Sequence, residues 1–140
     1  MYKNDALVRP RYSETDQMGV IYHGNYYMWF EVGRSDFFRS LGYTYKRLEQ
    51  EGIILPVVES SCKYIKPAMY DEEVLIRTTV EFQKGIRIGF KYEVLRREDE
   101  VLLAEGRTLH AFVGRDLKPI RFKSLSEEFR NIVDRVKPQV

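Results

Sequence analysis

A chain of 140 residues with 44% hydrophobic side chains is long enough to bury a core without disulfide or metal staples. Its net charge of +2 is nearly balanced, which argues against a nucleic-acid-binding protein, because such proteins usually carry a concentrated basic face. The N-terminus lacks the apolar stretch of a signal peptide, no apolar run is long enough to cross a bilayer, and the single cysteine, Cys62, fits a reducing compartment. We therefore expect a cytoplasmic protein without an integral membrane segment, folded as one domain over residues 1–140.

The first part of the chain predicts a strand followed by a long buried helix. We expect the strand over residues 6–12, a polar turn over 13–19, and a helix that begins at Gly24 and Asn25, which are good N-cap residue types, and ends near Gly42. Apolar side chains cover several faces of this helix, so it should be buried on more than one side. One stripe carries Tyr26, Phe30, Phe37 and Leu41 with Gly33 between them, while Met28, Trp29 and Val32 lie on other faces. A short amphipathic segment follows over residues 45–50.

The rest of the chain predicts four strands and a closing helix. The strands are expected over residues 53–64, 74–82, 86–94 and 101–113, and the helix over residues 124–136. Apolar and polar residues alternate in the second and third strands, with Val80 and Phe82 on the same buried face, and Lys84-Gly85 is a hairpin signal between them. Because no helix separates these strands, a succession of hairpins is favoured over a parallel fold. The sequence thus predicts an α+β fold in which a single antiparallel sheet wraps around a long central helix.

The densest chemistry lies between the first strand and the long helix, in residues 12–26. Asp16 stands shortly before the expected helix start, where unpaired backbone N–H groups and the positive end of the helix dipole meet. Such N–H groups can stabilise an oxyanion, and a carboxylate can activate water or attack a carbonyl itself. Gly19 and Gly24 would let a ligand approach the backbone. An aspartate here also suits a plain turn, because turn aspartates commonly cap helices and bond their own backbone.

This stretch resembles the signature of the 4-hydroxybenzoyl-CoA thioesterase family, in its YbgC-like acyl-CoA thioesterase branch. The matching residues are Thr15-Asp16, Gly19-Val20, Tyr22-His23, Asn25-Tyr26, Phe30-Glu31 and Arg34, with further matches at Pro56-Val57-Val58, Tyr64, Pro67-Ala68 and Ala104-Glu105-Gly106. The resemblance implies a single hot-dog domain, a homodimer or homotetramer whose active sites use two chains, and thioester hydrolysis without a metal. It places the family's catalytic aspartate on Asp16 and the histidine of the branch on His23.

We therefore predict an acyl-CoA thioesterase that releases a free carboxylic acid and CoA. Asp16 would act as general base or nucleophile, and the backbone amides at the helix N-terminus would form the oxyanion hole. His23 would orient Asp16 or the substrate, or would simply bond a backbone carbonyl at the helix entrance. The predicted substrate-binding residues are Tyr22, Gly24, Asn25 and Tyr26 around the helix start, together with Lys84 and Arg87.

The last two residues are assigned to the phosphates of CoA. Lys84 and Arg87 flank the hairpin glycine, and a lysine and an arginine both suit phosphate binding. Lys63 and Lys66, which precede Pro67, form a second pair of cations. Each pair could equally be an ordinary solvated surface.

Other candidates are interpreted as structural. Glu31 and Arg34 are three residues apart and can pair along the helix surface. Cys62 and His110 are expected to pack within strands, and the spacing of His23 and His110 shows no metal-ligand pattern, so neither a metal nor another cofactor is expected.

Two other functions stay open at this point. An acyl-carrier-protein thioesterase would use the same motif, because the acyl arm is chemically alike in both substrates. A non-catalytic acyl-thioester sensor or interaction module would have no need of Asp16, which argues against it.

Overall fold

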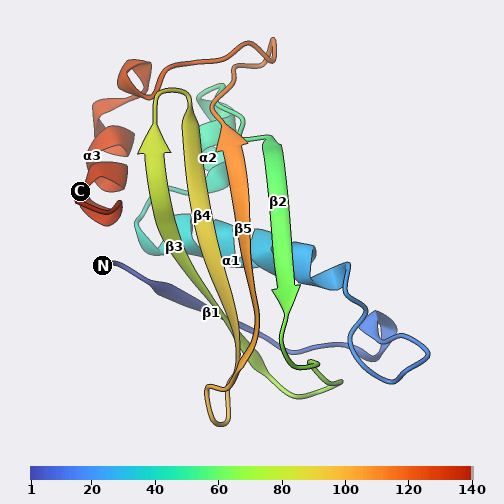
Figure 1. Ribbon diagram of the computed structural model, residues 1–140. Coiled ribbons are helices and arrows are strands. Elements are labelled where there is room, and N and C mark those ends of the chain that lie inside the picture. The colour runs from blue at the N-terminus through green and yellow to red at the C-terminus, as the bar shows by residue number, and fades with distance from the viewer. Residues whose placement is uncertain (140) are drawn as a thin grey trace.

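The computed structural model describes residues 1–139, so Val140, the last residue of the predicted domain, lies outside the described residues. One sheet curves around a long helix, and the C-terminal helix lies beside β3 (Figure 1). The strands are β1 (Asn4–Val8), β2 (Val57–Tyr64), β3 (Val74–Lys84), β4 (Arg87–Arg96) and β5 (Leu102–Ala111), and the helices are α1 (Asn25–Ser40), α2 (Tyr45–Gln50) and α3 (Glu127–Val136), with short 3-10 turns η1 (Tyr12–Glu14) and η2 (Phe122–Ser124). The five strands form one antiparallel sheet, which confirms the predicted α+β fold around a central helix.

The strand order differs from the predicted hairpin succession. The sheet runs β1-β3-β4-β5-β2, so β2 pairs with β5 at one edge and not with β3, the next strand along the chain. Residues 65–73 cross between the two instead of forming a tight turn, and β1 takes the free edge of β3. The succession was wrong for this pair because alternation fixes which face of a strand is buried but not which strand lies beside it.

Proline sets two strand boundaries that the apolar pattern placed wrongly. β1 ends at Val8 instead of residue 12, because Pro10 follows and the chain then turns into η1. β2 begins only at Val57, directly after Pro56, instead of at residue 53. The bounds of β3, β4 and β5 lie within two residues of the predicted ranges. Among the helices, α2 matches its predicted range, and α3 begins three residues late because Ser126 caps it.

The long helix lies directly on the sheet. The ring of Phe30 stacks on that of Tyr92 in β4, with centroids 4.5 Å apart and planes 9° apart. A Cβ added at Gly33 would lie 2.6 Å from Ile76 Cγ2, and one added at Gly106 in β5 would lie 2.4 Å from the Phe30 ring. Both glycines are therefore required for the close approach of helix and sheet, which leaves no room between them.

One apolar residue of β3 lies on the opposite face from the predicted one. The register of β3 against β4 shifts between Val80 and Phe82, so the alternation slips by one residue there. Val80 is fully buried, whereas Phe82 is 38% exposed and lies over Gly89 on the outer face of the sheet. The expectation that Phe82 shares the buried face was wrong because of this bulge.

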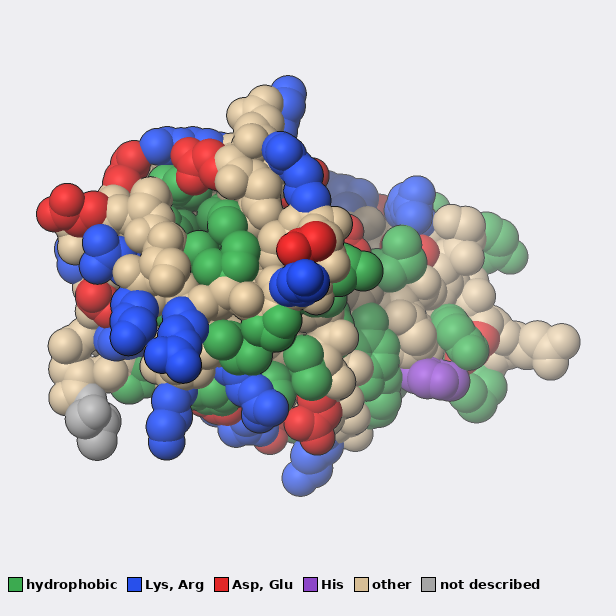
Figure 2. All heavy atoms as spheres, turned by 90° about the horizontal axis from the view of Figure 1, so that it is seen from above, with side chains coloured by type: hydrophobic (Ala, Val, Ile, Leu, Met, Phe, Trp, Pro, Cys, Tyr) green, Lys and Arg blue, Asp and Glu red, His purple; other side chains and the backbone are tan. Residues whose placement is uncertain are grey.

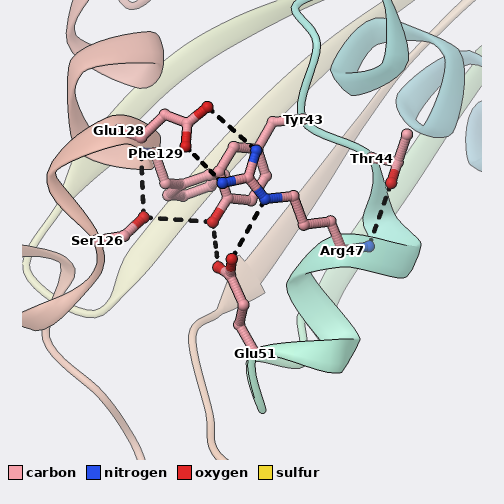
Figure 3. Close-up of polar contacts among 7 residues, drawn as sticks. All are labelled: Tyr43, Thr44, Arg47, Glu51, Ser126, Glu128 and Phe129. Carbon is pink, nitrogen blue, oxygen red and sulfur yellow. Dashed lines mark hydrogen bonds and ion pairs between the residues drawn. The ribbon is translucent and has the colours of Figure 1, made fainter.

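The helices α2 and α3 are joined by a polar cluster on the side of the molecule (Figure 3). The guanidinium of Arg47 lies 4.0 Å from the centroid of the Tyr43 ring and donates to Glu51 and Glu128. The Tyr43 hydroxyl in turn contacts Glu51 and Ser126, the N-cap of α3. This cluster holds the start of α3 against α2.

Arg34 points into the core and does not pair with Glu31, contrary to the prediction. Its Nε donates to the Tyr45 hydroxyl at 2.7 Å, and Nη1 donates to the Tyr92 hydroxyl at 3.0 Å. Arg34 is only 8% exposed, because the helix stripe that carries it faces the sheet and not the solvent.

His110 ends a chain of hydrogen bonds that starts at Arg34. The Tyr92 and Thr108 hydroxyls are 2.6 Å apart, His110 Nε2 lies 2.8 Å from Thr108 Oγ1, and His110 Nδ1 lies 3.0 Å from the carbonyl oxygen of Leu55. A carbonyl only accepts, so Nδ1 carries the proton and Nε2 accepts from Thr108. With His110 neutral, each hydroxyl and ring N–H in this series of hydrogen bonds has an acceptor. His110 is fully buried, as predicted.

We expect the protein to lose stability as the pH falls from about 6.5, the usual histidine pKa, towards 4. Burial, and then the charge of Arg34, lower the pKa of His110 to about 4. Between these values the unfolded chain binds more protons, so stability present above pH 6.5 is lost on acidification, by up to about 3 kcal/mol. Urea denaturation across this range should show a shallower pH dependence for His110→Gln. The matched control is His23→Gln, which changes the exposed histidine, and identical slopes for all three proteins would contradict the assignment.

Candidate active site

The loop between η1 and α1 is closed upon itself by backbone hydrogen bonds. The N–H of Asp16 donates to Val20 O at 2.9 Å, and the N–H of Gly19 donates to Asp16 O at 3.0 Å. Thr15 and Ile21 form an antiparallel bridge at the base of this turn, and Gly19 has a φ of +80°, which a glycine adopts without strain. The sequence therefore builds a tight turn that carries Asp16 next to its base, in the loop that precedes α1. Figure 1 shows this loop beyond the N-terminal end of α1.

The Asp16 carboxylate is half-buried, and only one of its oxygens is engaged. Oδ1 accepts the backbone N–H of Met18 at 2.9 Å, which is the turn role that aspartates commonly play. For Oδ2 no partner is recorded in residues 1–139. The turn bond thus fixes the orientation of the side chain while it leaves one oxygen open to a ligand.

Two adjacent backbone N–H groups at the entrance of α1 point to no recorded acceptor within the described residues. The neighbouring groups are engaged, since Tyr22 N–H donates to Glu14 O at 2.8 Å and Asn25 N–H donates to Tyr22 O at 3.0 Å. His23 and Gly24, which lie between them, have no such bond. The first N–H groups of a helix carry partial positive charge, so this pair is a suitable site for a carbonyl oxygen or an oxyanion.

Asp16 and His23 line one open cavity of about 260 Å³ with residues from a distant segment. Tyr64, the last residue of β2, and Lys66 just beyond it also line the cavity, as does Tyr26, whose ring centroid lies 5.0 Å from that of Tyr64. No hydrogen bond joins Asp16 to His23 in the described chain. The cavity is shallow and open, which suits a site that a second surface would complete.

The other predicted residues at the helix start lie around this cavity in different ways. Tyr22 is 49% exposed, and its ring centroid is 4.4 Å from that of His23. Asn25 turns its side chain away, because its Nδ2 donates to Glu14 O at 2.9 Å. Tyr26 is buried, and its hydroxyl accepts the N–H of Ala68 at 3.2 Å. Gly24 lies under the Tyr22 ring, which an added Cβ would approach to 2.8 Å.

Tyr64 is the site residue whose role sequence reasoning missed. Its hydroxyl donates to the carbonyl oxygen of His23 at 3.0 Å, so it ties the end of β2 to the entrance of α1. Burial, and then the neighbouring Cys62, raise the pKa of Tyr64, and the hydroxyl therefore stays protonated as a donor. In the sequence, Tyr64 was noted only because it matches the family pattern together with Pro67-Ala68. That match did not show which segment its side chain contacts.

Lys84 and Arg87 are not part of this cavity. They lie at the β3–β4 hairpin, at the other end of the sheet from the 12–24 loop (Figure 1). A second cavity of about 470 Å³ at this end is lined by Gln83, Arg121 and Lys123, among others. Figure 2 looks down on this end and shows several Lys and Arg side chains on its surface.

In the described part of the chain, no ion pair is recorded for Lys84, Arg87, Arg121 or Lys123. These four cations at the β3–β4 hairpin and η2 are called the hairpin cations below.

The same range, 1–139, contains no group of three His, Cys, Asp or Glu side chains placed to hold a metal ion. None of its helices is both long and apolar enough to span a membrane.

Comparison with known proteins gives consistent matches over most of the chain. A family model described as the thioesterase superfamily matches residues 18–111, a span that begins two residues after Asp16 and includes His23 and Tyr64. The putative acyl-CoA thioesterase YneP of Bacillus subtilis is 31% identical over 138 residues, which cover 98% of this chain and 99% of that protein. The acyl-CoA thioesterase YbgC of Haemophilus influenzae is 29% identical, with coverage of 89% and 93%.

Solved structures agree with these relatives. The DHNA-CoA thioesterase of Staphylococcus aureus superposes with a TM-score of 0.91 at 37% identity, over 96% of this chain and 91% of that one. The hypothetical protein TT1821 of Thermus thermophilus superposes with a TM-score of 0.89 at 32% identity, over 99% and 100% of the two chains.

Proposed function

The chain belongs to the thioesterase superfamily, and on this basis we propose that it hydrolyses an acyl-CoA thioester to a free carboxylic acid and CoA. That it is a thioester hydrolase with the hot-dog fold follows from its relatives and from the thioesterase structures that superpose on it. One observation carries the more detailed proposal. Asp16 and His23 line the same cavity, and within residues 1–139 neither Asp16 Oδ2 nor the N–H groups of His23 and Gly24 at the helix start have a hydrogen-bond partner.

In the proposed reaction, the thioester carbonyl oxygen binds at the N–H groups of His23 and Gly24. These donors are fixed by the helix and stabilise the negative charge that develops on the oxygen. Asp16 either takes a proton from the attacking water or attacks the carbonyl carbon to form a mixed anhydride, which water then cleaves. The C–S bond breaks in both routes, and CoA leaves as the thiol after protonation of its sulfur.

The surrounding residues take supporting roles in this proposal. The His23 side chain lines the cavity with Asp16 but makes no bond to it, so it acts on the substrate or the attacking water. Tyr22 provides exposed ring surface for the acyl or pantetheine arm, and the buried Tyr26 lines the cavity that receives it. Asn25 and Tyr64 hold the backbone of the helix entrance in place.

The active assembly is proposed to be a homodimer at minimum, with a homotetramer as a pair of such dimers. β2 is an edge strand whose outer side has no partner strand within residues 1–139, and it carries Val57 and Val58, which are 52% and 56% exposed. An exposed apolar edge of this kind favours pairing with another chain. Antiparallel pairing of two β2 strands sets the Val57 end of one chain beside the Tyr64 end of the other.

This pairing also accounts for the distance between the hairpin cations and the cavity within one chain. The hairpin end of one subunit would lie near the Asp16 cavity of the other subunit, so that the cations meet the phosphates of CoA while the thioester reaches Asp16.

An acyl carrier protein, which is acidic, remains the second candidate substrate, because the same unpaired cations suit an acidic surface. A non-catalytic binding module stays the least favoured function, since it has no use for the open Asp16 oxygen.

Asp16→Asn should retain the fold and lower kcat by at least about 10²-fold, because it removes the base or nucleophile. The matched control is Asp116→Asn, since Asp116 makes the same turn bond, to the N–H of Lys118 at 3.0 Å, far along the chain. Thiol release should be measured with the best substrate from a panel of acetyl-CoA, octanoyl-CoA, palmitoyl-CoA and benzoyl-CoA. A folded Asp16→Asn protein with near-normal turnover would refute the mechanism.

The proposed assembly is a dimer or a tetramer, which a mass measurement in solution can test. Light scattering at the concentration of the activity assay should give the mass of a dimer or a tetramer. A monomer that is active at this concentration would contradict the proposed assembly, because each cavity would then work without a second chain.

Lys84→Ala/Arg87→Ala should raise KM for acyl-CoA with kcat changed by no more than a few-fold. The phosphates lie far from the reacting carbon, so contacts to them contribute equally to the ground state and the transition state. The effect should be small for an acyl-pantetheine, which lacks these phosphates, and salt should mimic it, because about 0.1 M salt screens exposed charges beyond about 10 Å. Lys3→Ala/Lys46→Ala removes the same charge elsewhere. An equal effect on both substrates would leave the hairpin cations as solvated surface.

A further inference from the structure

Glu14 is a buried carboxylate that the proposed chemistry does not use. It is 8% exposed and is the only carboxylate among the buried polar residues of the described chain. Its Oε1 accepts the backbone N–H of Arg11 at 2.7 Å, and its Oε2 accepts the indole N–H of Trp29 at 3.3 Å. Burial of a carboxylate costs free energy unless hydrogen bonds compensate for it, and here both oxygens have a donor.

The backbone carbonyl of Glu14 accepts two further bonds, both from residues that lie later in the chain. Its carbonyl oxygen accepts the N–H of Tyr22 at 2.8 Å and Nδ2 of Asn25 at 2.9 Å. Tyr22 and Asn25 directly flank the pair of unpaired N–H groups at the helix entrance. Glu14 therefore bonds both to the end of the loop that carries Asp16 and to the first and second turns of α1.

The partner of the Glu14 side chain on α1 is itself rigid. Trp29 is 2% exposed, and its ring centroid lies 4.9 Å from that of Tyr26, which is bonded to the Ala68 N–H. The carboxylate thus connects the loop to a fixed point on the helix and not to a mobile surface group.

Asp16 lies two residues after Glu14, and the N–H groups of His23 and Gly24 lie within the segment that Glu14 closes. Because the loop carries the carboxylate and the helix carries the oxyanion donors, the bond between Glu14 and Trp29 sets the distance between the two. We propose that Glu14 is a positioning residue, which holds Asp16 in register with the oxyanion-hole amides. This inference rests on the roles proposed above for Asp16 and for these amides.

A purely structural role for Glu14 makes a different prediction. In that case, loss of its bonds would lower the melting temperature and the folded fraction, while the folded molecules would turn over at the normal rate. A positioning role lowers kcat of the fully folded enzyme, because a displacement of about 1 Å between reacting groups can cost about 10²-fold in rate. KM for acyl-CoA would hardly change, since the contacts that bind the CoA end lie elsewhere.

The experiment uses Glu14→Gln, Trp29→Phe and the double variant in full-length protein, with the panel's best acyl-CoA as the probe. Glutamine keeps the size of the side chain but sets an amide N–H against one of the two donors, and phenylalanine removes the indole donor. Each single variant should lower kcat by about 10-fold or more with KM within about two-fold. The double variant should lose about as much kcat as the more impaired single variant, and not the product of the two losses, because both changes break the same bond.

The control is Thr108→Val, which breaks the buried chain at His110, away from the catalytic loop. It should lower the melting temperature with kcat unchanged at a temperature where the protein is folded. If Glu14→Gln does not fold, Trp29→Phe decides, because it leaves the carboxylate bonded to Arg11.

Normal kcat in folded Glu14→Gln or Trp29→Phe would overturn the inference. It would also be overturned if Thr108→Val lost as much kcat as these variants for the same drop in melting temperature. Asp16→Asn, assayed in parallel, separates this failure from failure of the proposed function. Normal turnover of Asp16→Asn would refute the mechanism itself. An inactive Asp16→Asn beside a fully active Glu14→Gln would refute the positioning role alone.

Discussion

The close contact between α1 and the sheet is the constraint on which the rest of the molecule depends. Gly33 and Gly106 have no side chain where helix and strands meet, and Phe30 stacks flat on Tyr92 in the space between them. A close-packed interior tolerates little displacement, so the axis and the height of the helix above the sheet are fixed together. The N-terminus of α1 consequently projects beyond the sheet on the side of β2, next to the loop that precedes the helix (Figure 1).

The helix entrance is held on three sides, each by a different segment. Glu14 bonds it from η1, the Tyr64 hydroxyl bonds the His23 carbonyl from the end of β2, and the N–H of Ile21 donates to Ala68 O at 3.0 Å in the segment after β2. These bonds leave few free rotations in the loop, which reduces the reorganisation that a reaction at this site would require. The chemical groups themselves remain open, because none of these three bonds uses Asp16 Oδ2 or the N–H groups of His23 and Gly24.

A nearly neutral composition conceals an uneven distribution of charge. At the β4–β5 turn, cations and carboxylates are paired, with Arg96 beside Asp99 at 2.8 Å and Arg97 beside Glu73 at 2.8 Å. At the other end of the sheet, the hairpin cations have no recorded carboxylate partner in the described chain. Such a cluster of cations raises the positive potential at that end, and the net charge of the chain gives no sign of this asymmetry.

The sequence by itself determined the features that depend on near neighbours: the start of α1 at its Gly24-Asn25 cap, the buried faces of β3 and β4 up to the bulge, and an aspartate in a turn before a helix. Caps, turns and alternation act over a few residues, so they can be read directly. Only the tertiary structure decided that β2 lies beside β5, that Arg34 meets tyrosines and that Tyr64 reaches His23. Each of these contacts joins segments far apart in the chain, and no local period specifies which distant segment a side chain will meet.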